Sequence, residues 1–534
     1  MATRPAPLLS SPPVPIAAGA LLSAGLVGAM MAAGVPLGIG LLMALCYAPL
    51  VMLNLPVGLA LWVALVFVEH HPAVSVGPNA AGILIGLAWV GTLGARRATA
   101  LPLLRRHRKL VGAILLLLVW LTMSLVWADR PGLAFGDVWV WFVAALVFLV
   151  VATTIEEPRH VRLIIAAFIL GAVMSVAIGV ADGALQSSGT AIDTATATEG
   201  RLQGGGGDPN YLAAGLVPAI VLAAGLAAGT LNPIARWVLG VAMAFLGLGL
   251  AATQSRGGIL AAVAVVVAAF VVFRRRRAQV LGLVAAAAAV AGLWFASTPG
   301  AWERVTSFDG GGNGRTELWE VGWRMYGDHP ATGVGLNNFR HEAPRYVRKP
   351  GNLEFVELIA ERPRVVHNAY LQLLVETGVI GVLLFAGVGL ACLRAAWLAA
   401  RRFDALGDDH MATLARSAFV ALVGMLVASF FLSNGPDKRL WTLFALGPAL
   451  LGLAHRTPDA TSVHAQFDRV LDTLADSSCE SPSISRPPGP TCWPSPPSRK
   501  RSGGRSGATT PASGSTARSA AAPTSSASSP TATP

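Results

Sequence analysis

The sequence is poor in charged residues. Asp, Glu, Lys and Arg make up only 13% of its 534 residues, against roughly 25% in ordinary soluble domains. Hydrophobic residues make up 54% of the chain. This balance excludes an ordinary soluble enzyme and indicates an integral membrane protein.

Cysteine is also scarce. Two of the four cysteines, Cys46 and Cys392, lie in apolar runs, and the other two, Cys479 and Cys492, lie near the C-terminus. Their spacing suggests neither a metal site nor a disulfide framework. The sequence also lacks a cluster of carboxylates of the kind that holds Mg²⁺. We therefore expect no metal and no cofactor.

Phosphate-loop motifs are absent too. The glycine runs GGGGDP (204–209) and GVGLNN (333–338) are not followed by the Lys-Ser or Lys-Thr of a nucleotide-binding loop, and neither fits a dinucleotide fingerprint. We expect both runs to allow tight turns or a close approach of two backbones.

Long apolar runs dominate what is present. Each is long enough, as a helix, to cross about 30 Å of hydrocarbon. They lie near residues 16–34, 37–53, 57–69, 79–94, 110–127, 136–155, 161–181, 210–228, 235–252, 258–273, 279–296, 376–399, 412–432 and 440–454. Pro49 and Pro56 break the second and third runs. The predicted fold is an all-α polytopic membrane protein with about 12–14 transmembrane helices.

Basic residues predict the orientation. Lys and Arg concentrate in three short loops, within residues 96–109, 274–277 and 401–402, which the span count places on one side of the membrane. That side must be the cytoplasm, so both termini are expected inside. The net charge of +12 then reflects topology and the basic tail, and it does not require nucleic acid as a partner.

The chain divides into a membrane domain and a tail. Residues 1–455 form the predicted transmembrane domain, which a polar stretch at 297–366 interrupts on the outer face. This stretch contains RTELWEVGWRMYG, which has helical spacing, and we expect a small folded extracytoplasmic cap. Residues 456–534 are rich in Ser, Pro, Thr, Ala and Gly. They have too little apolar surface to offset the entropy of ordering, and we expect a disordered cytoplasmic tail.

Four polar elements converge on the predicted outer face. They are the loop GRLQGGGGDPNYLA (200–213), the turn TQSRGG (253–258), the cap with GRTELW (314–319) and HPATGVGLNNF (329–339), and the helix opening HNAYLQ (367–372). This convergence is the main indication of a functional site.

Two arginines stand out among these elements. Arg256 lies in a short turn between apolar helices on the side where arginine is disfavoured, and Arg201 repeats the anomaly in its own loop. Planar guanidiniums suit an anionic ligand held at the membrane, such as a lipid-linked diphosphate. The alternative is an arginine that extends to the headgroups, with Gly257 and Gly258 serving close helix packing.

His367 is the candidate proton acceptor. A neutral imidazole can take a proton from a hydroxyl near physiological pH. The alternative is a structural His, with Asn368 capping the first helical turn. Glu376 lies about 13 Å further along the helix axis. We expect Glu376, and Gln372 in the same way, to satisfy a buried polar partner without orienting His367.

The motifs RLQGGGGDPNYLAAG, SRGG, GRTELW, HPATGVGLNNF and HNAYLQLLVETGVIG occur in this order. Together they resemble the O-antigen ligase and O-antigen polymerase family of bacterial membrane glycosyltransferases, over about residues 200–390. The resemblance implies a polytopic GT-C enzyme in the cytoplasmic membrane of a bacterium. Its donor would be an undecaprenyl-diphosphate-linked glycan, and its acceptor a hydroxyl of a sugar or lipid-linked glycan, outside the membrane.

The resemblance also implies roles for single residues. His367 would activate the acceptor hydroxyl, and Arg256 and Arg201 would bind the diphosphate, with Asn368 and Asn210 in support. Arg315 is a further candidate, although Glu317 and Glu320 could hold it in a helix pair. The implied reaction is a metal-independent single displacement with inversion. The glycine insertion at 204–207 is longer than the family pattern.

Other functions remain open from sequence alone. A polymerase of the same family would differ from a ligase only in its acceptor. A transporter or flippase for anionic lipid-linked sugars belongs to another class, but such proteins tend to have paired repeats with sites at mid-membrane. An inactive scaffold in an export complex is the third alternative.

Overall fold

The computed structural model describes residues 47–71, 76–92, 102, 104–187, 200–306, 315–347 and 364–457. These residues all belong to the first of two compact units, Met1–Ala465. Every regular element among them is helical, as predicted. The expected run at 16–34, most of the run at 37–53, and the tail from residue 458 lie outside the described residues.

Eight helices in the described part of the chain are long and apolar enough to cross a membrane. They are α6 (Arg108–Met123, continued by η2, Ser124–Val126), α7 (Pro131–Thr154), α8 (Pro158–Ser187), α9 (Pro209–Gly229), α10 (Pro233–Ala252), α12 (Arg277–Ser297, preceded by η4, Arg274–Arg276), α17 (Ala369–Ala405) and α18 (Asp409–Ala428, continued by η6, Ser429–Phe431). The chain is thus a multi-pass membrane protein. Each predicted run from 57–69 onward coincides with a helix.

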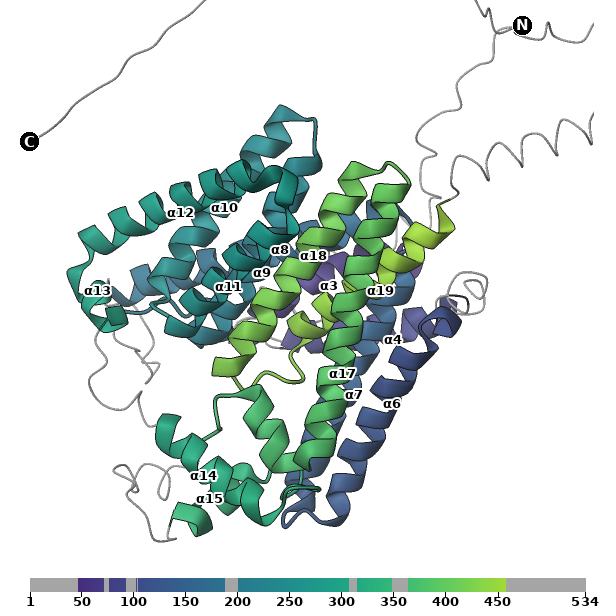
Figure 1. The fold of residues 1–534 in the computed structure, drawn as a ribbon, viewed down its shortest axis with the longest axis vertical. Helices are drawn as coiled ribbons and strands as arrows, with labels where there is room; N and C mark the ends of the chain where they lie inside the picture. Colours follow the sequence, from purple (N-terminus) through teal and green to yellow (C-terminus); the bar gives the residue numbers. More distant parts are fainter. Residues whose placement is uncertain are drawn as a thin grey trace, which may run out of the picture. The chain divides into compact units, whose positions relative to one another are not determined.

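The remaining helices are shorter or more polar. The apolar ones are α3 (Leu55–Leu65, continued by η1, Val66–Val68), α4 (Val76–Thr92), α11 (Arg256–Val272) and α19 (Lys438–Arg456). The polar ones are α13 (Pro299–Thr306), α14 (Arg315–Asp328) and α15 (Phe339–Val347). Figure 1 shows the apolar helices side by side in a bundle, with α14 and α15 at one end of it.

Small residues let the bundle helices approach closely. A Cβ atom added at Gly225 of α9 would lie 2.3 Å from the Ser417 hydroxyl of α18, and one added at Gly447 of α19 would lie 2.5 Å from the Cys392 carbonyl of α17. In a membrane, helix association depends on such close packing because lipid is as apolar as the side chains. Helices α9, α17, α18 and α19 form the centre of the bundle in this way.

Four helices begin at the same end of the bundle with a polar cap. Asp208 precedes α9, Ser255 precedes α11, Asn368 precedes α17 and Asp437 precedes α19, and each side chain accepts a backbone N–H of the first turn. Such caps satisfy donors that the helix itself cannot. The predicted cap by Asn368 is confirmed, since its Oδ1 accepts from the N–H groups of Tyr370 and Leu371, both at 3.1 Å.

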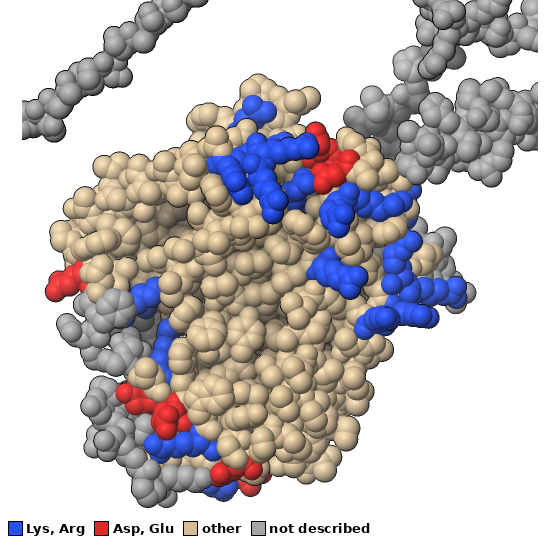
Figure 2. Space-filling model, in the orientation of Figure 1, with Lys and Arg blue, Asp and Glu red and all other residues tan. Residues whose placement is uncertain are grey.

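Basic residues gather at the opposite end. Figure 2 shows Lys and Arg concentrated on the end of the bundle away from α14 and α15. There Arg402 at the end of α17 donates to the carbonyl of Ala454 in α19, and Arg456 donates to the carbonyl of Ile155 after α7. The bundle therefore has one strongly basic end and one end that carries the polar caps.

Helices α14 and α15 form a second, smaller core against α17. Leu318, Met325, Phe339 and Val375 are among its buried side chains. The helix expected from RTELWEVGWRMYG is confirmed as α14.

The segment before α15 crosses α17 at a kink. Gly378 has φ +68° and interrupts the helical geometry of α17. The N–H groups of Val334 and Gly335 donate to the carbonyls of Val375 and Glu376 at 3.0 and 2.9 Å. Gly333 and Gly335 also have positive φ. The prediction that GVGLNN permits a close backbone approach is confirmed.

The other glycine run makes a tight turn. Gly204 and Gly207 of GGGGDP have φ +64° and +70°, and a 3-10 helix, η3 (Gly204–Gly206), lies between them. A Cβ atom at Gly205 would lie 2.9 Å from the side chain of Val68. This run therefore folds tightly against η1 just before the cap of α9.

Substitution of Gly378 by Ala should destabilise the fold. A Cβ atom there would lie 2.0 Å from the carbonyl oxygen of Ala331, and the left-handed backbone adds strain. We expect a loss of at least about 2 kcal/mol of stability, measured as a lower thermal unfolding midpoint of the full chain in detergent.

Gly387→Ala is the matched control on the same helix. A Cβ atom at Gly387 would meet nothing within 4 Å, and alanine favours a helix by roughly 0.5–1 kcal/mol over glycine. Equal losses of stability in the two variants would contradict the role given to the kink.

Candidate active site

The capped end of the bundle brings the four predicted polar elements together. Arg315 at the start of α14 lies within electrostatic range of Asp208 and Arg256. His367 lies within range of Arg315 and Asp208, and also of Arg340 and Arg364. Residues more than 150 positions apart in the sequence thus surround one imidazole, as the predicted convergence requires.

His367 is held in an unusual backbone conformation. Its φ is +53°, in the left-handed region that non-glycine residues rarely adopt and that is common at functional sites. Its N–H donates to the Ser433 hydroxyl at 3.1 Å, which joins the start of α17 to the turn before α19. Because Asn368 caps the helix, the His367 side chain is not needed for that purpose. The helix cap by Asn368 and a chemical role for the His367 side chain are therefore compatible.

The half-buried imidazole is a neutral base. Burial, followed by the Arg315 guanidinium, lowers the pKa of His367 to about 4, although Asp208 acts in the opposite direction. At neutral pH the ring is therefore uncharged and can accept a proton.

Arg256 is the first residue of α11. Its Nε donates to the carbonyl of Val305 in α13 at 3.2 Å. The two glycines that follow it pack tightly, Gly257 against Phe431 and Gly258 against Ala213. The close packing that the alternative reading gave these glycines is present, and Arg256 lies within electrostatic range of Arg315.

Arg201 fastens one loop to another. Its Nε donates to the carbonyl of Thr253 at 2.9 Å, and its Nη2 donates to Asn210 Oδ1 at 3.1 Å. The Ser255 hydroxyl also donates to Asn210 Oδ1, at 2.9 Å. Arg201 and Asn210 thus hold the turn that leads into Arg256.

Arg315 is not held by the acids of its own helix. Glu320 pairs with Arg324 at 3.0 Å, and no ion pair joins Arg315 to Glu317 or Glu320 within the described residues. The pairing with Glu317 or Glu320 that helix spacing allowed is therefore not formed, and Arg315 lies within electrostatic range of Asp208 instead. Burial and the Arg256 guanidinium lower the pKa of Arg315, opposed by Asp208, and an arginine remains charged all the same.

Sequence analysis missed three charged residues of the site. Asp208 appeared only within a glycine-rich loop, and Arg340 and Arg364 appeared as ordinary charges of a polar segment. All three lie within electrostatic range of His367. The only sequence signal was their position next to motifs already singled out.

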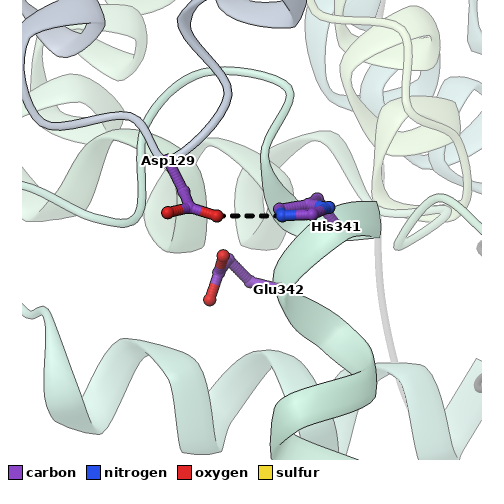
Figure 3. Close-up of side chains that lie close together, drawn as sticks. All are labelled: Asp129, His341 and Glu342. Atoms are coloured by element: carbon purple, nitrogen blue, oxygen red, sulfur yellow. Dashed lines mark hydrogen bonds and ion pairs between the residues drawn. The ribbon is translucent and has the colours of Figure 1, made fainter.

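An ion-pair cluster lies beside the site. Figure 3 shows Asp129, from the turn between α6 and α7, directed at His341 of α15, with Glu342 next to them. The Asp129–His341 distance is 2.9 Å, and their ligand atoms together with that of Glu342 lie within 4.8 Å of one another. The Arg345 guanidinium contacts Glu342 at 2.8 Å and Asp129 at 3.5 Å.

This cluster fastens α15 in place. The His341 hydrogen bond, with the Arg345 charge, holds the pKa of Asp129 below its usual range. Since the Arg345 guanidinium pairs with both carboxylates, we interpret the cluster as a latch between α15 and the α6–α7 turn.

Glu376 lies inside the bundle, 2% exposed. Gln372 Nε2 donates to its carboxylate at 3.3 Å, so the expectation that Glu376 satisfies a buried polar partner is confirmed. A cavity of about 70 Å³ next to it is also lined by Asp137 and Ser433. This cavity is large enough for about two water molecules.

An open apolar groove leads to the site. Its volume is about 620 Å³, and it is lined by residues of α11, α17 and α18 that include Leu260, Tyr370, Phe430 and Phe431. Phe431 packs on Gly257, next to Arg256, and Tyr370 follows His367 by three positions. The groove therefore reaches the charged site along the side of the bundle.

Comparison with known proteins supports one family. A family model described as O-antigen ligase matches residues 241–386, a stretch that contains Arg256, Arg315 and His367 but not Arg201 or Asn210. No curated protein matches the chain. Residues 241–386 are thus similar to the O-antigen ligase family.

Proposed function

We propose that the protein is a glycosyltransferase of cell-surface polysaccharide assembly. It transfers a glycan from an undecaprenyl-diphosphate carrier to a hydroxyl acceptor. The observation that carries this proposal is an imidazole, His367, within electrostatic range of the Arg315 guanidinium, which is itself within range of Arg256. A base and an anion site are the two groups that such a transfer needs.

The orientation of the protein follows from its charges. Because basic loops remain on the cytoplasmic side of a membrane, the basic end of the bundle faces the cytoplasm of a bacterium. The active site and the cap at 297–366 then lie outside the cytoplasmic membrane, and both termini lie inside. The runs outside the described residues would bring the spans to about 12–14.

The reaction is a single displacement. The acceptor oxygen attacks the anomeric carbon while His367 takes its proton, and the bond from that carbon to the diphosphate breaks. The diphosphate leaves with the bonding electron pair, and Arg256 and Arg315 stabilise its charge. Attack opposite the leaving group inverts the anomeric centre. Because a diphosphate is a good leaving group, the two guanidiniums suffice and no metal is required.

Donor binding also strengthens the base. An anionic diphosphate beside Arg315 neutralises the charge that helps to lower the pKa of His367. The imidazole then becomes a better proton acceptor when the donor is in place. This coupling links substrate binding to the protonation step.

The apolar groove supports a lipid-linked donor. Phe431 of its lining packs on Gly257, which follows Arg256, so a diphosphate at Arg256 would direct its prenyl chain along α11 and α18. Each buried CH₂ group contributes about 0.8 kcal/mol. Ligase and polymerase activities would use the same groove, base and arginines, and would differ only in the acceptor.

Arg201 and Asn210 support the site indirectly. They hold the turn before Arg256, so any contact of Arg201 with the diphosphate would add to this positioning role. Asn368 begins α17 and thereby sets the position of His367.

His367→Ala and Arg256→Ala should each abolish glycan transfer. Loss of the base should cost roughly 10²- to 10⁴-fold in rate, and loss of the arginine leaves the diphosphate charge without a donor. The measurement is the pattern of lipid-linked and surface glycan on gels, from a host without its own surface-polysaccharide ligase and polymerase.

The matched control is Arg324→Ala, which removes a guanidinium of α14 that pairs with Glu320 outside the site. It should behave as the wild type. If the wild type, His367→Ala and Arg256→Ala all gave the same glycan pattern, the roles proposed for His367 and Arg256 would be wrong.

The acidic limb of the pH profile should lie well below pH 6.5. In the free enzyme, activity is lost as the pH falls through the pKa of His367, about 4, because protonation removes the base. Arg315→Gln removes a positive neighbour, so it should raise this pKa and move the limb to higher pH. The measurement is kcat/KM against pH. A wild-type limb near pH 6.5 that Arg315→Gln does not move would contradict the assignment.

Ala264→Trp should obstruct the groove. Ala264 lines it, and exclusion of two buried CH₂ groups would raise the KM for the donor about tenfold. Leu383→Trp, at a position of α17 that is 64% exposed and does not line the groove, is the control. The same donor KM in both variants would show that the prenyl chain binds elsewhere.

A further inference from the structure

We propose that Ser433 is a positioning residue of the transferase and that Tyr211 acts on His367 through Ser433. Together they hold the peptide unit between Val366 and His367 in the orientation that places the imidazole for proton transfer. The inference rests on the proposed transferase function and deepens it, because it assigns the placing of the base to residues that do not contact the reacting atoms.

The peptide unit between Val366 and His367 is hydrogen-bonded at both ends. Its N–H donates to the Ser433 hydroxyl at 3.1 Å. Its carbonyl, that of Val366, accepts from Trp319 Nε1 at 3.0 Å. Trp319 belongs to α14, whereas Ser433 lies in the turn before α19. Two separate elements therefore fix this peptide just before α17 begins.

These two hydrogen bonds maintain the left-handed backbone of His367. Its φ of +53° is unfavourable for a residue that has a Cβ atom. The angle φ sets the direction of Cβ relative to the preceding peptide, and α17 fixes the chain that follows, from Ala369 onward. Without the Ser433 hydroxyl, the peptide can rotate toward the ordinary negative range of φ. The imidazole then loses its fixed direction.

Ser433 is itself held by Tyr211. The Tyr211 hydroxyl donates to the Ser433 carbonyl at 2.7 Å. Tyr211 lies in the first turn of α9, where its N–H donates to the capping Asp208 carboxylate at 3.1 Å. Its carbonyl accepts from Arg439 Nη1 of α19 at 3.3 Å. One tyrosine thus joins the starts of α9 and α19 to the turn that holds His367.

The network ends in a buried ion pair. Arg439 is 9% exposed, and its Nη2 lies 2.6 Å from Asp437 Oδ2. Its guanidinium also lies over the Phe67 ring, 5.6 Å from the ring centre. A paired charge inside the bundle cannot leave its partner without a large cost. Tyr211 is therefore anchored on rigid elements, as accurate placement of a base requires.

The alternative is that these hydrogen bonds only join helices. The Tyr47 hydroxyl provides the comparison, because it donates to the carbonyl of Gly58 in α3 at the same distance, 2.7 Å. Neither Tyr47 nor Gly58 is part of the proposed site. Removal of either tyrosine hydroxyl takes away one hydrogen bond of the same kind and length. Only a positioning role makes the two substitutions differ in reaction rate.

The test uses the full chain in lipid vesicles. An undecaprenyl-diphosphate-linked oligosaccharide is the donor, and a lipid-linked oligosaccharide is the acceptor. The kcat, the KM for the donor and the thermal unfolding midpoint are measured for the wild type, Ser433→Ala, Ser433→Thr, Tyr211→Phe and the double variant of Ser433→Ala with Tyr211→Phe. Tyr47→Phe is the matched control.

Ser433→Ala and Tyr211→Phe should each lower kcat by roughly tenfold or more, since a small misplacement of a reacting group can cost about 10²-fold. The donor KM should not change, because Arg256 and Arg315 are intact. Ser433→Thr keeps the accepting hydroxyl and should keep most of the rate. The double variant should be no slower than Ser433→Ala, because both substitutions release the same peptide. Tyr47→Phe should have the wild-type kcat and an unfolding midpoint lowered as in Tyr211→Phe.

Four results would overturn the inference. They are a wild-type kcat in Ser433→Ala or Tyr211→Phe, an equal loss of kcat in Tyr47→Phe, a Ser433→Thr variant as slow as Ser433→Ala, and losses that multiply in the double variant. If Ser433→Ala does not fold, the comparison of Tyr211→Phe with Tyr47→Phe decides alone. In each case the wild type still transfers glycan, and the proposed function stands. Absence of transfer by the wild type would instead overturn the proposed function, and this inference with it.

Discussion

The proposed chemistry depends on the electrostatic interaction between a neutral imidazole and positive charge. His367 lies within electrostatic range of Arg315, Arg364 and Arg340 at one end of an apolar bundle, with Asp208 as the opposing charge. Such an excess of positive charge is unfavourable in the empty protein and becomes favourable when an anion binds. Burial and the same charges lower the pKa of the base, and a bound anion would raise it. The same group of charges would thus determine both the affinity for an anionic substrate and the pKa of the base.

The fold maintains this arrangement through its helix ends. The caps of α9, α11 and α17 place Asp208, Arg256 and His367 at one end, and Arg201 ties two of the intervening loops together. The kink at Gly378 lets the segment before α15 cross α17, which brings Arg340 within range of the site. Rigid backbone connections, more than direct contacts between the charged side chains, therefore determine where the charges lie.

Sequence predicted the features that depend on local chemistry. Apolar runs predicted the helices, a single Asn predicted the cap of α17, and glycines with no phosphate-loop context predicted a close backbone approach. The partner of Arg315 and the place of Arg340 were not predicted, for a common cause. Both depend on which distant loop lies near a side chain, and helix spacing alone allowed only a pairing of Arg315 with Glu317 or Glu320. The apolar groove was not predicted for the same reason, since its lining comes from three helices that are apolar like the rest of the bundle.

The most direct test of the central claim measures the protonation of His367 as an anion binds. Histidine side chains of the full chain would be followed by NMR against pH in lipid nanodiscs, with and without farnesyl diphosphate, and His367→Gln would assign the signal. The account predicts a midpoint near pH 4 that rises on addition of the diphosphate, and a smaller rise in Arg315→Gln. A midpoint near 6.5 that the diphosphate leaves unchanged would contradict it.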